Sequence, residues 1–156
     1  MTHEARIKEL KLELPPPGKS IGCYKLVHIV DGLAYVSGTG PVAADGTSTC
    51  GKLGETLQKE AGYDAARRTA LRMLATLRAE LGSLDAIARL VKTIGFVNAT
   101  PDFKDHPAVI NGFSELMRDV FGPENGVGAR SALGVASLPG GWAVEIEAVF
   151  QMAEKR

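Results

Sequence analysis

The sequence lacks any excess of one charge and any long apolar run. Lysine plus arginine and aspartate plus glutamate each number 18 among 156 residues, so the formal net charge is zero. This balance argues against the broad basic surface of a nucleic-acid-binding protein. No apolar stretch approaches the roughly 20 residues of a membrane-spanning helix, and the N-terminal residues lack the apolar core of a signal peptide. We therefore expect a cytoplasmic protein with no membrane segment and no nucleic-acid partner.

Cysteine and histidine are also scarce. The two cysteines, Cys23 and Cys50, are more typical of free thiols than of a disulfide in a cytoplasmic chain of this size. The three histidines are scattered, and none forms a metal-ligand spacing with either cysteine. We therefore predict neither a metal nor a cofactor.

The patterns that are present predict one α+β domain over residues 21–156, preceded by a helical arm over residues 1–20. Branched and aromatic residues predict strands at 24–30 and 33–37, around the Asp31-Gly32 turn signal. Apolar residues at three- and four-residue spacing predict helices at about 55–81 and 107–121, with a strand at 87–99 between them. Two further strands follow, so we expect two helices on one face of a mixed sheet.

The last two strands lie between residues 126 and 150 and are joined by a Pro-Gly-Gly turn, which suggests a hairpin. In the second strand the two-residue period predicts a core face made of Trp142, Val144, Ile146, Ala148 and Phe150. Glu145 and Glu147 then lie on the opposite face. In the first strand we expect the helices to meet Leu133 and Val135, with Arg130, Ala132, Gly134 and Ala136 on the other side.

That second face combines small residues with charges. Small residues allow another backbone to approach closely, so the face suits a homo-oligomer interface, and a solvated sheet face remains an equal alternative. Arg130 could hold an anionic substrate there, or it could form an ion pair with Glu145 or Glu147. In a hairpin Arg130 would lie opposite residues 149–151, on the order of 10–20 Å from Glu145, which disfavours that pair.

Several segments resemble one known family, the Rid proteins (YjgF-type, also labelled L-PSP endoribonucleases). The stretch ARSALGVASLPGGWAVEIEA is similar to the family signature. IGCYKLV resembles its Ile-Gly-Pro-Tyr segment, YVSGTGPV its Ser-Gly-Gln-Ile-Pro segment, and VINGFSEL its Val-Asn-x-x-Tyr helix. The resemblance covers roughly residues 21–152.

The resemblance implies a chorismate-mutase-like fold, a homotrimer with clefts between subunits, and hydrolysis of reactive 2-imino acids or enamines, such as 2-iminopropionate, to a 2-keto acid and ammonia. It implies that Arg130 binds the substrate carboxylate and that Glu145 positions the attacking water. It also places five residues at the substrate: Tyr24, Ser37, Gly38, Asn111 and Ala132. The family often has cysteine at the position of Ala132, proline at that of Cys23, and tyrosine near Ser114.

Two other functions compete with the deaminase. The first is a trimeric protein that binds a small carboxylate without turnover, and the second, less favoured, is an endoribonuclease. The presence of both Arg130 and Glu145 favours the enzyme, because binding alone needs only the arginine. The neutral net charge disfavours the ribonuclease.

Overall fold

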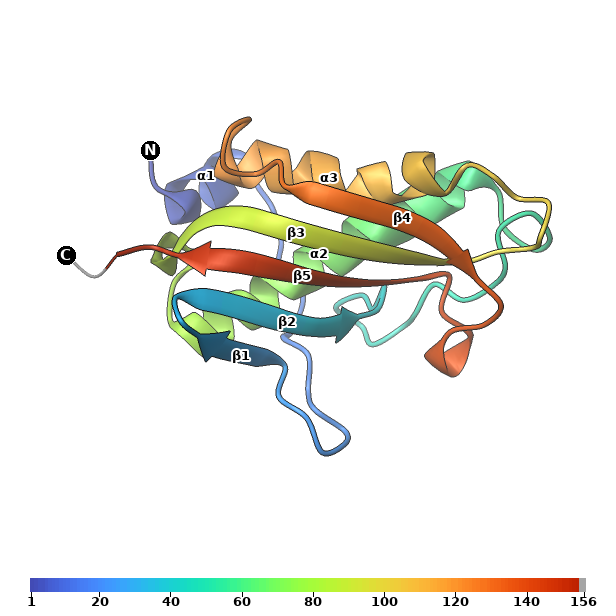
Figure 1. Cartoon of the computed structure of the whole chain (residues 1–156), viewed down its shortest axis with the longest axis horizontal. Helices are drawn as coiled ribbons and strands as arrows, with labels where there is room; N and C mark the ends of the chain where they lie inside the picture. The colour runs from blue at the N-terminus through green and yellow to red at the C-terminus, as the bar shows by residue number, and fades with distance from the viewer. Residues whose placement is uncertain (155–156) are drawn as a thin grey trace.

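A five-stranded sheet with the order β1-β2-β5-β3-β4 forms the centre of the computed structural model, which describes residues 1–154 (Figure 1). The strands are β1 (Val27–Val30), β2 (Leu33–Thr39), β3 (Ile87–Asn98), β4 (Ala129–Val135) and β5 (Val144–Met152). Only β3 and β4 pair in parallel. Two long helices, α2 (Lys59–Leu81) and α3 (His106–Phe121), cover one face. The predicted α+β architecture, with two helices on one face of a mixed sheet, is confirmed, while residues 155–156 of the predicted domain lie outside the described residues.

The turn and helix signals in the sequence are confirmed, with small shifts at the element boundaries. Val30 pairs with Leu33 across Asp31 and Gly32, which both have positive φ, as a tight hairpin requires. The helix α2 begins at Lys59 and not near residue 55. It ends at Gly82, whose φ of 82° and N–H bond to the Arg78 carbonyl form a left-handed cap.

The core lies between the sheet and the two helices. Four predicted residues of β5 are buried in it, namely Val144, Ile146, Ala148 and Phe150. Trp142 does not belong to this set: it precedes β5 and is only half-buried, with its ring against Gly40. The adjacent Ala143 is fully buried instead.

The predicted hairpin between β4 and β5 is wrong. β5 lies between β2 and β3, and β4 pairs only with β3, at the sheet edge. In Figure 1 the two strands are accordingly separated by β3. The reason is the connection through α3, which carries the chain from the end of β3 back to its start and so allows parallel pairing.

The predicted faces of β4 are also reversed. Arg130 lies beside the buried Thr93, and Ala132 lies beside Gly95, so both residues are on the helix side of the sheet. A Cβ atom at Gly134 would come within 2.5 Å of His106 Nε2 on α3. The small residues of β4 therefore allow α3 to pack closely. Leu133 lies on the uncovered face, where it is 39% exposed.

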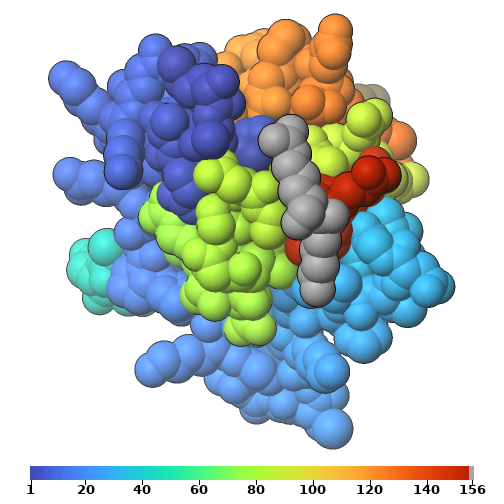
Figure 2. Space-filling model, turned by 90° about the vertical axis from the view of Figure 1, so that its left-hand side faces the viewer, coloured from blue at the N-terminus to red at the C-terminus, as the bar shows by residue number. Residues whose placement is uncertain are grey.

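The N-terminal residues form a helix, α1 (His3–Glu9), which packs beside α3 and the start of β3 (Figure 2). It is shorter than predicted and ends before Leu10, so Leu14 and the prolines lie outside it. No helix in residues 1–154 is long and apolar enough to span a bilayer. The division of the chain at residue 20 stays a prediction.

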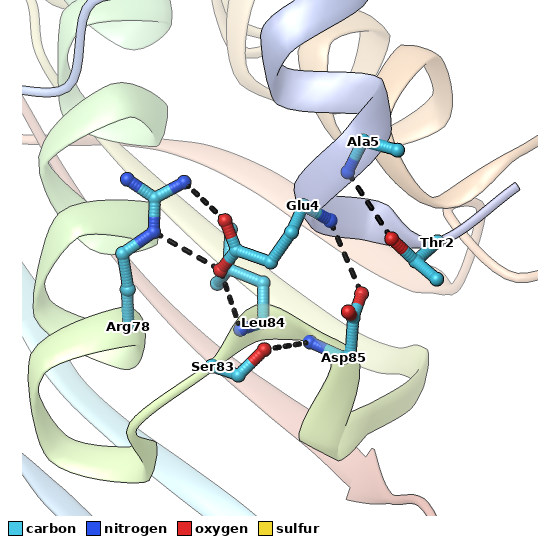
Figure 3. Close-up of polar contacts among 7 residues, drawn as sticks. All are labelled: Thr2, Glu4, Ala5, Arg78, Ser83, Leu84 and Asp85. Atoms are coloured by element: carbon cyan, nitrogen blue, oxygen red, sulfur yellow. Dashed lines mark hydrogen bonds and ion pairs between the residues drawn. The ribbon is translucent and has the colours of Figure 1, made fainter.

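Glu4 attaches α1 to the rest of the chain (Figure 3). Its carboxylate accepts hydrogen bonds from Arg78 Nη2 at 2.6 Å, from Arg78 Nε at 3.0 Å and from the Leu84 N–H at 3.0 Å. Burial by itself would raise the pKa of Glu4, but the bonds from Arg78 and Leu84 outweigh burial and lower it.

We expect Glu4→Gln to reduce the free energy of unfolding by about 1–2 kcal/mol near neutral pH, a value that allows for partial solvent screening. Because the folded-state pKa of Glu4 is lowered, this stabilisation is present above the ordinary carboxyl pKa. It is lost as the pH falls through the folded-state value. Urea denaturation at several pH values measures it.

The matched control is Glu9→Gln, which removes the more exposed pair between Glu9 and Arg6 within α1. This change should cost less than about 0.5 kcal/mol. Equal losses in the two variants would contradict the role assigned to Glu4.

Candidate functional site

Arg130 is held by two neutral side chains of α3. Its Nη1 donates hydrogen bonds to Asn111 Oδ1 at 2.8 Å and to Ser114 Oγ at 3.2 Å. Among residues 1–154 it forms no ion pair, so the predicted alternative of a bond to Glu145 or Glu147 is not realised within the chain. The residue is exposed, and its Nε and Nη2 groups have no partner in the part of the chain that the structure describes. The guanidinium is thus oriented while its charge is available to an anion.

Glu145 lies on the uncovered face of the sheet, against Gly38. A Cβ atom at Gly38 would come within 2.5 Å of Glu145 Oε1, so only glycine leaves room for this carboxylate. Burial raises the pKa of Glu145, and the nearby charge of Glu147 raises it further. The carboxylate is therefore a stronger proton acceptor than an ordinary glutamate.

Tyr24 and Ser37 lie near this carboxylate. The Ser37 hydroxyl donates to the Lys25 carbonyl at 2.6 Å, and the Ser37 N–H donates to the Leu26 carbonyl at 2.9 Å. These bonds fix the segment that carries Tyr24. Tyr24 is 47% exposed and lines a small cavity together with Gly38.

The structure brings the predicted residues together as two groups and not as one. The first group is Tyr24, Ser37, Gly38 and Glu145, and the second is Asn111, Arg130 and Ala132. Arg130 aligns with Thr93 and Ala148, whereas Glu145 aligns with Phe96. Their Cα atoms are thus three residues and two strands apart, roughly 14 Å, and their side chains are on opposite faces.

The uncovered face presents apolar side chains as well as charges. Tyr35 is 43% exposed there, and Leu133 lies in the same transverse row as Phe96 and Glu145. A hollow of about 360 Å³ on this face is lined by His28, Tyr35, Ser37, Lys92 and Glu147, among others. Exposed apolar side chains on a sheet face are typical of a surface that another protein covers.

Sequence reasoning missed Arg72, which lines the same cavity as Tyr24 and Gly38. The sequence shows only the spacing: Arg72 is three residues after Thr69 and four before Thr76, and the structure shows that both threonines are buried. These positions share one helix face. Cys23 and Cys50 are free and exposed, and no cluster of metal ligands occurs among residues 1–154.

A family model and a curated protein match most of this chain. The family model described as "YjgF/chorismate_mutase-like, putative endoribonuclease" matches residues 4–140. Protein TCP17 of Trypanosoma cruzi is 38% identical over 149 residues, which cover 95% of this chain and 92% of that protein.

Two solved structures are similar over nearly the whole chain. Atu1372 of Agrobacterium tumefaciens, whose function is unknown, has a TM-score of 0.86 and 37% identity over 97% of this chain and 92% of its own. A protein of Shewanella oneidensis MR-1 named "putative endoribonuclease" has a TM-score of 0.91 and 26% identity over 97% of this chain and 99% of its own. The chain belongs to the YjgF/chorismate mutase-like family.

Proposed function

We propose that the protein is a hydrolytic deaminase that converts reactive 2-imino acids, or the enamines in equilibrium with them, into 2-keto acids and ammonia. The observation that carries this proposal is the state of Arg130. Its guanidinium is fixed by Asn111 and Ser114 yet has no carboxylate partner among residues 1–154. A planar cation held in this way suits the carboxylate of a small substrate.

The chemistry needs few protein groups. The imine carbon is already electrophilic, so that positioning the substrate next to a water supplies most of the rate enhancement. Glu145 accepts a proton from that water as the water oxygen bonds to the imine carbon, and the electron pair of the C=N bond passes to nitrogen, which is protonated. Glu145 passes the water proton to that nitrogen, which gives a carbinolamine. The hydroxyl proton of the carbinolamine then moves by way of Glu145 to the same nitrogen, the C=O bond forms, and ammonia leaves with the electrons of the C–N bond.

We further propose that the complete site forms between two copies of the chain in a homotrimer. Arg130 and Glu145 are too far apart to act on one small substrate within a single chain. The edge that carries Arg130 could meet the uncovered sheet face of a second copy, where Glu145 and exposed apolar side chains lie. Residues Asn111 and Ala132 would then face Tyr24, Ser37 and Gly38 of the neighbour.

The other two functions have less support. A protein that only binds carboxylates would have no need of the half-buried carboxylate of Glu145, whose ionised form is destabilised. An endoribonuclease would be expected to contact several phosphates through lysine and arginine, whereas charge over the chain is balanced.

Arg130→Ala should reduce kcat/KM for 2-iminopropionate about 100-fold or more, because a charge-assisted carboxylate contact is lost. Asn111→Asp should raise KM at least about tenfold, since it places a competing carboxylate 2.8 Å from Arg130 while retaining the shape of the side chain. An amino-acid oxidase generates the imine in the assay, and the decay of the imine is followed.

The charge-matched control is Gln151→Glu, which adds the same charge at an exposed position on β5. From the strand register it lies roughly 14 Å from Arg130. Its KM should stay near that of the wild type. If the wild-type protein does not accelerate imine decay over buffer, the proposed function is wrong.

Glu147→Gln should move the acid limb of the kcat/KM profile to lower pH. Glu145 must be ionised to accept a proton, so activity falls as the pH falls through its pKa. Removing the neighbouring negative charge lowers that pKa, so ionised Glu145 persists to lower pH. Glu124→Gln, a change at an exposed loop position, should leave the profile in place. An acid limb that stays fixed in Glu147→Gln would show that Glu145 is not the titrating group.

A further inference from the structure

A cavity of about 120 Å³ lies beside the proposed site, between α2 and the segment that precedes β1. Its lining includes Lys19, Tyr24, Gly38, Arg72, Thr76 and Trp142. In Figure 1 the segment between α1 and β1 loops out at the lower edge of the sheet before it enters β1. The Gly18 N–H donates to Thr76 Oγ1 at 3.0 Å, which holds this segment over α2.

Arg72 is the unusual group of this cavity. It is half-buried, and within residues 1–154 its guanidinium has neither a hydrogen bond nor an ion pair. Burial lowers its pKa, which the nearby Tyr24 opposes. On the same helix Arg78 is also half-buried but is matched by Glu4. A partly desolvated cation without a counter-charge is costly, and an anion in the cavity would offset that cost.

The cavity adjoins the proposed catalytic carboxylate through Gly38. This residue lines the cavity and is also in contact with Glu145. A ligand that holds an anionic group at Arg72 would have to pass Gly38 to bring its reacting carbon to Glu145. The substrate carboxylate is already assigned to Arg130, so this group would be a second one.

We propose that Arg72, assisted by Lys19, binds the second carboxylate of a dicarboxylic substrate, so that the preferred substrates are 2-imino acids related to acidic amino acids. This inference rests on the proposed function. The guanidinium fork matches a carboxylate, and the exposed Lys19 adds positive charge at the cavity wall. The cavity of about 120 Å³ has room for a carboxylate on a short methylene chain.

Binding can be measured without turnover, because Trp142 is the only tryptophan and lines the cavity. We titrate stable keto acids against tryptophan fluorescence. Wild-type protein should bind 2-oxoglutarate at least about tenfold more tightly than its 5-methyl ester, which has a similar open chain but one carboxylate fewer. Equal affinities would overturn the proposal, and this comparison requires no variant.

Arg72→Gln should weaken 2-oxoglutarate binding by about tenfold or more and leave pyruvate binding unchanged. Arg68→Gln is the control, since Arg68 is exposed on the same helix and does not line the cavity. If Arg72→Gln binds 2-oxoglutarate as tightly as Arg68→Gln does, Arg72 does not hold the second carboxylate. Competition by inorganic phosphate but not by succinate would likewise overturn the assignment to a carboxylate.

Turnover separates this inference from the proposed function. Imines are generated by oxidases from aspartate, glutamate and alanine, and wild-type kcat/KM should be at least about tenfold higher for the dicarboxylic imines. Acceleration of all three imines with no such preference would refute the role of Arg72 and leave the deaminase intact. Selective 2-oxoglutarate binding without acceleration of any imine would refute the deaminase and retain the carboxylate site.

Discussion

The parallel pairing of β4 with β3 decides where the charged residues of this protein can act. It places Arg130 over α3 and beside Thr93, on the helix side of the sheet edge. Glu145 lies on the central strand β5 and points from the opposite face. A single chain therefore presents the cation of Arg130 and the carboxylate of Glu145 on two different surfaces. The proposed chemistry requires a second copy to bring the surfaces together.

Within residues 1–154 the charged residues around the proposed site lack partners of opposite charge, whereas a structural arginine elsewhere has one. Arg78, which attaches α1, is matched by a carboxylate, whereas Arg130 and Arg72 are not matched within the described chain. Glu145 has a second carboxylate nearby and forms no ion pair among residues 1–154. Unpaired, partly buried charges reduce the stability of an isolated chain. Binding of an anionic substrate and contact with a neighbouring copy would offset this loss of stability.

Local signals in the sequence predicted most elements correctly, because they depend on neighbouring residues. The Asp31-Gly32 turn, the Gly82 cap and the alternation in β5 are of this kind. The pairing of β4 was mispredicted because alternation shows which residues share a face but not which strand lies alongside. The Pro-Gly-Gly turn resembled a hairpin loop. It instead joins two strands that are not neighbours, because β3 lies between β4 and β5 in the sheet. At the sheet edge none of the residues of β4 is fully buried, so its two faces differ little in burial.

The site residues were named by resemblance, and the structure adds their grouping. No spacing in the sequence shows that Gly38 contacts Glu145, or that Gly62 makes room in α2 for Leu53 and Val109. Arg72 was not singled out in the sequence, because periodicity describes one helix at a time and does not show which segment packs over it. The segment that covers it is more than 50 residues earlier in the chain, at Gly18.

The most direct test of the account is subunit complementation between two inactive variants. Arg130→Ala and Glu145→Gln subunits are co-expressed with different tags, and the mixed oligomers are isolated and assayed for imine hydrolysis. If each site takes Arg130 from one copy and Glu145 from the next, every mixed trimer has one intact site out of three, so the isolated mixed oligomers should have about one third of the wild-type activity. Mixed oligomers as inactive as either variant alone would contradict a site shared between copies.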